Sequence, residues 1–104
     1  DGSVVRDFLD VRDLADLCAL ALDSDVSGVF NAGQGKGASI LDILGMIEKT
    51  VGKSLEPVFK PGRNFDVPRV VLDTSRARRA FDWAPKVDLE TGIGFAWKWV
   101  SQQV

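Results

Sequence analysis

The chain has 104 residues, of which 45% are hydrophobic and 27% are charged, and its formal net charge at pH 7 is -2. This composition predicts one folded domain with a modest core and excludes an intrinsically disordered chain. The acidic balance lacks the positive surface expected of a protein that binds nucleic acid or an anionic membrane. No apolar run reaches the roughly 18 residues of a membrane span, and no segment resembles a signal peptide. The expected location is therefore the cytoplasm.

The side chains that are present limit the chemistry of the chain. It has no histidine and no tyrosine, so two side chains that often transfer protons are missing. The single cysteine, Cys18, excludes a disulfide framework and a cysteine-based zinc site, and we expect it to be a core thiol. The sequence begins with Asp1 instead of methionine, and we expect a piece of a longer protein.

An amphipathic helix is predicted near the start of the chain, from Val11 to about Asp23. Asp10 is placed to act as its N-cap, and Asp13 as the carboxylate at the third helical position. The apolar residues that share one face predict a stripe that packs on the core: Val11, Leu14, Leu17, Cys18 and Ala21.

A second amphipathic helix is predicted to begin at Ile40 and to end before Gly52. Ser39, with Asp42 three residues later, has the spacing of a capping box. The apolar face of this helix consists of Ile40, Ile43, Leu44, Ile47 and Val51.

Two short strands are predicted beside these helices. Residues 29–32 form a brief apolar run bounded by glycines. Residues 55–61 predict an edge strand, because the prolines in this segment would interrupt a central ladder.

Two further helices are predicted in the last third of the chain. Asp73 or Thr74 can cap a helix that runs to about Phe81, which Trp83 closes. The last helix begins near Asp88. Its apolar stripe consists of Leu89, Ile93, Ala96, Trp97, Val100 and Val104. The fold class is therefore a small α+β arrangement with about four helices and two or three short strands.

The glycine-rich loop FNAGQGKGAS, residues 30–39, fits a dinucleotide-binding fingerprint loosely through Gly33, Gly35 and Ala38. Such a turn also needs an acidic residue at the end of the next strand to hold the ribose hydroxyls. Glu56 begins the next predicted strand instead of ending it. We therefore interpret the loop as a tight corner before a capped helix, and we expect no NAD site on it.

Five segments occur in a recognisable order: DGSVVRDFLDVRDLA, GVFNAGQGKGAS, RNFDVP, LDTSRARRAFDWAPK and LETGI. Together, over residues 1 to about 99, they resemble the C-terminal part of extended short-chain dehydrogenase/reductases, the NAD-dependent nucleotide-sugar epimerases and dehydratases. The resemblance implies that residues 1–104 are a single nucleotide-sugar-binding domain, the substrate lobe of a Rossmann-type enzyme without the Rossmann core. It also implies that NAD and the catalytic Tyr-x-x-x-Lys pair belong to an absent N-terminal domain, so we expect no catalytic, cofactor or metal residue here.

The activity that the resemblance implies belongs to the parent protein. Hydride leaves the sugar to NAD, a keto intermediate forms, and hydride returns. Arg63 and Asp66, followed by Pro68, have the spacing of the epimerases, whereas the dehydratases often space the pair one residue wider. A 4,6-dehydratase, a reductase of the same family, and a non-catalytic structural or nucleotide-binding module stay open as alternatives.

By the same resemblance, the substrate-binding residues are Arg6, Arg63 and Asp66. Guanidinium groups neutralise a diphosphate well, and a carboxylate accepts hydrogen bonds from two ribose hydroxyls. Each residue also has a purely structural interpretation. Arg6 could pair with a carboxylate such as Asp10, and Arg63 with Asp66 could form a local ion pair that fixes a turn.

The expected partners are the nucleotide-sugar substrate and the protein's own N-terminal Rossmann domain. The arginine run RARRAF, residues 76–81, is interpreted as a solvated helix face and not as a nucleic-acid site. Trp99 lies off the last apolar stripe and is expected to face the absent domain. Apolar surface on the first helix predicts that the isolated chain self-associates.

Overall fold

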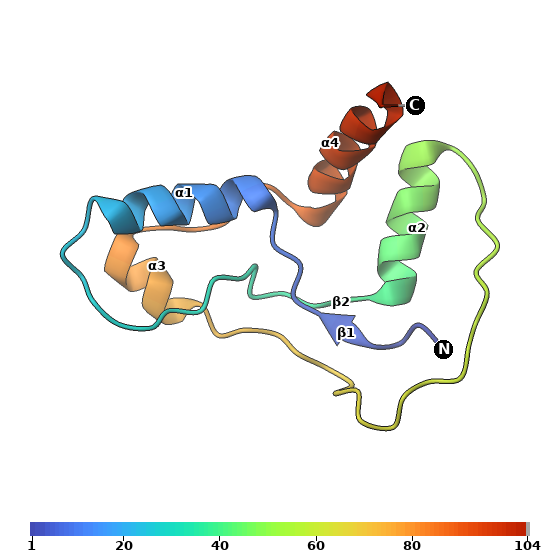
Figure 1. Ribbon diagram of the computed structural model, residues 1–104, viewed down its shortest axis with the longest axis horizontal. Coiled ribbons are helices and arrows are strands. Elements are labelled where there is room, and N and C mark those ends of the chain that lie inside the picture. The colour runs from blue at the N-terminus through green and yellow to red at the C-terminus, as the bar shows by residue number, and fades with distance from the viewer. Residues whose placement is uncertain (104) are drawn as a thin grey trace.

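The computed structural model describes residues 1–103, so Val104 of the predicted last stripe lies outside the described residues. In chain order the elements are β1 (Val5–Arg6), α1 (Val11–Leu22), β2 (Ala38–Ser39), α2 (Ile40–Val51), α3 (Ser75–Phe81) and α4 (Leu89–Gln102) (Figure 1). The predicted class, with four helices and two short strands, is confirmed. No helix within residues 1–103 combines the length and the apolar character needed to cross a membrane.

The two strands form a small antiparallel sheet. Val5 lies opposite Ser39, and Arg6 lies opposite Ala38. A single parallel bridge joins Val5 to Arg69 on the other side of β1. β1 therefore runs between the end of the glycine-rich loop and the segment that leads to α3.

The predicted strands at residues 29–32 and 55–61 are wrong. Both segments lack strand structure, and the sheet among the described residues contains only β1 and β2. A strand is defined by its hydrogen-bonded neighbour, and neither segment has one within residues 1–103. The composition of a segment cannot supply that neighbour.

The predicted helix caps are confirmed for α1, α2 and α4. The side chain of Asp10 accepts a hydrogen bond from a backbone N–H in the first turn of α1. Ser39 and Asp42 form both hydrogen bonds of a capping box, and Asp88 caps α4. Gly52 ends α2 with a left-handed φ of 75°, a conformation that glycine adopts without steric cost. The helix boundaries thus follow from local sequence.

The core is small and lies where α1 meets α3. Its buried hydrophobic residues are Leu17, Ala77 and Trp83. Four partly buried residues pack against them: Leu9, Phe30, Ala32 and Phe81. Trp83, which follows α3, thus makes the helix-closing contact that the sequence predicted.

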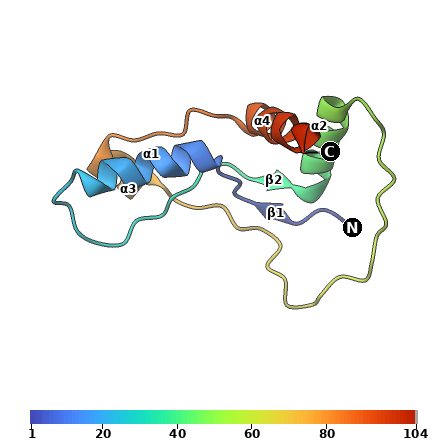
Figure 2. The same cartoon turned by 45° about the horizontal axis from the view of Figure 1, so that its top comes forward.

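Most of the predicted core-facing stripe of α1 is exposed. Only Leu17 is buried, whereas Val11 is 70% exposed and Cys18 is exposed. The prediction of a core thiol at Cys18 is therefore wrong for this chain. The reason is the shape of the molecule, whose extents are 49 × 38 × 18 Å. Figure 2 shows α1 and α3 at one end of this flat body and α2 with α4 at the other, so α1 has a neighbour on one side only.

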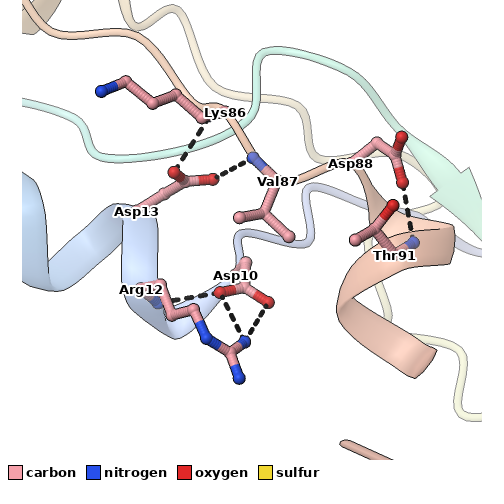
Figure 3. Close-up of polar contacts among 7 residues, drawn as sticks. All are labelled: Asp10, Arg12, Asp13, Lys86, Val87, Asp88 and Thr91. Atoms are coloured by element: carbon pink, nitrogen blue, oxygen red, sulfur yellow. Dashed lines mark hydrogen bonds and ion pairs between the residues drawn. The ribbon is translucent and has the colours of Figure 1, made fainter. Parts of the chain in front are cut away.

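The assignment of Asp13 as a capping carboxylate is also wrong. Its carboxylate is 1% exposed and accepts hydrogen bonds from the backbone N–H groups of Lys86 and Val87, both at 3.0 Å (Figure 3). The indole Nε1 of Trp83 donates to the backbone oxygen of Asp13 at 3.1 Å. These three contacts fasten α1 to the segment that leads into α4.

Candidate functional site

Arg6 occupies the second position of β1 and is half-buried. Its Nη1 donates hydrogen bonds to the backbone oxygens of Val5 and Val67, each at 2.8 Å. Asp10 instead holds the start of α1 and pairs with Arg12 at 3.4 Å. Arg6 therefore ties β1 to the residue that directly follows Asp66.

Arg63 and Asp66 form a two-point ion pair within one turn. The Nε of Arg63 lies 3.2 Å from Oδ2 of Asp66, and Nη2 lies 3.0 Å from Oδ1. The backbone N–H of Asp66 also donates to the oxygen of Arg63 at 3.3 Å. The guanidinium stacks over the ring of Phe65, with 5.1 Å between its central carbon and the ring centroid. Arg63 and Asp66 therefore form the local ion pair that fixes the turn, as the structural interpretation of these residues predicted.

This geometry leaves hydrogen-bonding capacity for a ligand. A guanidinium carries five N–H donors, and a carboxylate offers about four acceptor positions. Arg63 uses Nε and Nη2 on Asp66, which leaves Nη1. Arg6 uses only Nη1, which leaves Nε and Nη2. The ion pair and the backbone contacts thus hold two guanidinium groups and one carboxylate in place without using all of their hydrogen-bonding positions.

The three predicted site residues differ in exposure, since Arg6 and Asp66 are half-buried and Arg63 is exposed. The side chain of Arg63 is 68% exposed and that of Asp66 is 29% exposed. A hollow of about 300 Å³ lies between the glycine-rich loop, α2 and α4, lined by Phe8 and Met46 among others, and none of the three residues lines it. The candidate residues therefore lie outside this hollow, in β1 and in the loop before α3.

The backbone N–H groups of the glycine-rich loop are occupied by the side chain of Asp7. Its Oδ1 accepts from Gln34 at 2.7 Å, and its Oδ2 accepts from Gly35 at 3.0 Å and from Leu72 at 3.2 Å. A side chain at Gly33 would place its Cβ 2.8 Å from Oδ2 of Asp7, so the close approach requires glycine there. An internal carboxylate thus fills the position that a phosphate would take in a dinucleotide-binding turn.

Sequence reasoning missed the role of Asp7. The partners of Asp7 lie 27, 28 and 65 residues away in the sequence. No local pattern marks such contacts.

Three carboxylates beside helix N-termini, Asp42, Asp73 and Asp88, have a lowered pKa, and all three lie outside the candidate site. Backbone and side-chain hydrogen bonds from Ser39 lower the pKa of Asp42, and those from Thr91 lower the pKa of Asp88. A hydrogen bond and the charge of Glu90 raise the pKa of Lys49, whose ammonium lies 2.6 Å from that carboxylate. These pKa shifts arise from contacts at the N-termini of α2, α3 and α4 and from the ion pair that joins α2 to α4.

Two arginines of the run at residues 76–81 hold loops of the chain in place. Arg76 donates to the backbone oxygen of Val29 at 3.1 Å. Arg78 donates to the hydroxyl of Thr74 at 2.9 Å and to the backbone oxygen of Gln34 at 3.2 Å. Their guanidinium groups therefore have structural partners. Within residues 1–103 no group of acidic, cysteine or histidine side chains is arranged to bind a metal ion.

Comparison with known proteins identifies relatives along nearly the whole chain, although no protein-family model matches it. UDP-glucose 4-epimerase 1 of Oryza sativa subsp. japonica is 38% identical over 98% of this chain and 31% of its own length. UDP-arabinose 4-epimerase 1 of Arabidopsis thaliana is 33% identical over 95% of this chain and 25% of its own length. The chain thus spans only about a third or less of the length of these relatives.

Solved structures give the same match. The UDP-glucose 4-epimerase of Thermotoga maritima, crystallised with UDP-glucose, superimposes with a TM-score of 0.93 and 33% identity over 99% of this chain and 33% of its own. The UDP-glucuronic acid 4-epimerase of Bacillus cereus, in complex with UDP-glucuronic acid and NAD, gives a TM-score of 0.91 and 30% identity over 100% of this chain and 34% of its own. In sequence and in fold, the chain therefore matches the C-terminal part of the nucleotide-sugar 4-epimerases, members of the NAD-dependent extended short-chain dehydrogenase/reductase family, and the predicted resemblance is confirmed.

Proposed function

We propose that residues 1–104 are the nucleotide-sugar-binding domain of an NAD-dependent nucleotide-sugar 4-epimerase. The observation that carries this proposal is the match of the whole chain to the part of a UDP-glucose 4-epimerase that superimposes with a TM-score of 0.93. The relatives named above are 4-epimerases, which supports an epimerase over a dehydratase or a reductase.

In this proposal Arg6 and Arg63 bind the diphosphate, and Asp66 accepts hydrogen bonds from the ribose hydroxyls. The unused Nη1 of Arg63 and the unused Nε and Nη2 of Arg6 are suitable donors for phosphate oxygens. Because the ion pair fixes Arg63 and Asp66 before the ligand arrives, less side-chain freedom is lost on binding. The pair then has both a structural and a binding role.

The chain itself carries no hydride chemistry in this proposal. Asp7 occupies the only glycine-rich loop that resembles a cofactor turn, so the NAD site is assigned to the preceding part of the protein. The contribution of residues 1–104 is to hold the nucleotide, and thereby to keep the sugar near the reacting centre. The proposed location of the protein is the cytoplasm.

A titration of the isotope-labelled chain with UDP, GDP and dTDP, followed by NMR, tests the assignment. We expect saturable shifts near Arg6, Arg63 and Asp66, and their loss in Arg63→Ala and Asp66→Ala. Arg79→Ala removes an exposed guanidinium on α3 and serves as the matched control, with binding unchanged. A folded chain that shows no saturable shift with any of the three nucleotides would contradict nucleotide binding by these residues.

A further inference from the structure

Phe65 is a large apolar residue at the surface of the turn that joins Arg63 to Asp66. The backbone hydrogen bond from Asp66 to Arg63 closes this turn, with Asn64 and Phe65 at its centre. Phe65 is 72% exposed, so it adds nothing to the core. The central positions of a turn favour glycine, asparagine, aspartate and serine over an aromatic residue. Neither the core nor the turn therefore explains a phenylalanine at this position.

The ring of Phe65 lies against the guanidinium of Arg63. The central carbon of the guanidinium is 5.1 Å from the ring centroid, within the range of about 6 Å in which the face of an aromatic ring attracts a cation. Asp66 holds one edge of the same guanidinium through its Nε and Nη2 atoms. Arg63 is thus held at one edge by a carboxylate and over one face by a ring, while its Nη1 has no partner among the described residues.

The ion pair alone constrains Arg63 only weakly. The side chain of Arg63 is 68% exposed, so water competes for the charges of the pair and the long side chain remains flexible. A ring against the face of the guanidinium reduces this freedom, because the planar group loses its stacking contact when it swings away. An arginine that is already oriented loses less freedom when it binds a phosphate. The contact with Phe65 therefore bears on how well Arg63 can bind an anion.

On the basis of the proposed function, we infer that Phe65 is a positioning residue for the nucleotide site. Its ring holds the guanidinium of Arg63 in the orientation that binds the diphosphate, and Phe65 acts through Arg63 without touching the nucleotide. This role requires a flat aromatic ring. Tyrosine should therefore replace Phe65, whereas leucine, which is apolar but has no ring, should not.

The first part of the test measures the affinity of residues 1–104 for UDP by NMR titration. Phe65→Leu should bind UDP about 2- to 5-fold more weakly, which corresponds to the loss of about 0.5–1 kcal/mol for a cation–π contact at an exposed site. Phe65→Tyr should retain the wild-type affinity. Phe59→Leu is the matched control, because Phe59 is 60% exposed in the same loop and no guanidinium among the described residues lies over its ring. The control should leave the affinity unchanged.

The second part observes Arg63 directly, before any nucleotide is added. A proton that lies over the face of an aromatic ring has an upfield NMR resonance. We expect the Nε–H resonance of Arg63 to be upfield in the wild type and in Phe65→Tyr, and to move downfield in Phe65→Leu. The urea unfolding midpoint should stay at the wild-type value in all three variants, because the substituted rings are exposed.

Four outcomes would overturn this inference and leave the nucleotide site in place. The first is an equal UDP affinity in the wild type and in Phe65→Leu. The second is a weaker affinity without any movement of the Arg63 resonance, which would indicate that Phe65 contacts the nucleotide itself. The third is a Phe65→Tyr variant that binds as weakly as Phe65→Leu. The fourth is a loss of affinity that accompanies a lowered unfolding midpoint, which would assign Phe65 a role in folding.

Failure of the proposed function gives a different result. In that case the folded wild-type chain would bind none of UDP, GDP and dTDP, and the positioning role of Phe65 would be refuted together with the site. Binding of UDP by the wild type thus separates the two, since every comparison among the variants is made against that affinity.

Discussion

Replacing Asp13 with asparagine should destabilise the chain by about 2–4 kcal/mol, because the carboxylate accepts two backbone hydrogen bonds at a site that is 1% exposed. Hydrogen bonds to a charged group contribute about 1.5–3 kcal/mol each. Asparagine keeps one carbonyl acceptor, but its NH₂ group must then face the second N–H donor. One backbone N–H, at Lys86 or Val87, is left without an acceptor and without access to water.

Urea unfolding monitored by circular dichroism and by the fluorescence of the buried Trp83 measures this loss. Asp16→Asn is the matched control, since it makes the same charge change on an exposed residue of the same helix. The control should change the free energy of unfolding by less than about 0.5 kcal/mol. If Asp13→Asn and Asp16→Asn lower the free energy of unfolding equally, the hydrogen bonds from Lys86 and Val87 to Asp13 do not stabilise the chain, and the reasoning is wrong.

Three further predictions concern the loop, the caps and the exposed surface. Asp7→Asn should raise the amide exchange rates of Gln34 and Gly35 by at least about 10-fold, and unchanged rates would contradict the role of the carboxylate. The pKa of Asp42 lies below its ordinary value of 3.8, so its contribution to stability is present above about pH 4 and is lost as the pH falls through the lowered value. Ser39→Ala keeps the backbone N–H that is the larger cause and removes only the hydroxyl, so the pKa should rise partway toward its ordinary value, which carboxyl ¹³C NMR measures; an unmoved pKa would refute the contribution of the hydroxyl. Sedimentation should show that the isolated chain self-associates at high concentration, and a strictly monomeric profile would count against it.

The helix boundaries could be predicted because their causes are local. Ser39 and Asp42 are three residues apart, and Gly52 follows the last turn of the helix they start. The same holds for the turn that joins Arg63 and Asp66. In each case the sequence window that contains the signal also contains every group that forms the contact.

The remaining features could not be predicted because their causes lie far away in the sequence or outside the chain. Asp13 finds its partners 73 and 74 residues later. Residues 29–32 satisfy the local pattern of a strand and still form none, because pairing needs a second strand. Cys18 lies on an apolar stripe of which only Leu17 is buried among residues 1–103. Periodicity thus identified apolar faces correctly but could not say what covers them.

Because the core is small, hydrogen bonds between distant segments hold much of this chain together, and some of them involve the candidate site. Asp7 fixes the end of β1 to Leu72, and Arg6 fixes the neighbouring residue of β1 to Val67. The loop that carries Arg63 and Asp66 is therefore held to the sheet at one end, close to Arg6. A diphosphate that engaged both guanidinium groups would hold the loop at a second point. In the proposed function, nucleotide binding should thus raise the stability of the chain in proportion to the logarithm of ligand concentration, because the nucleotide binds the folded chain and not the unfolded one.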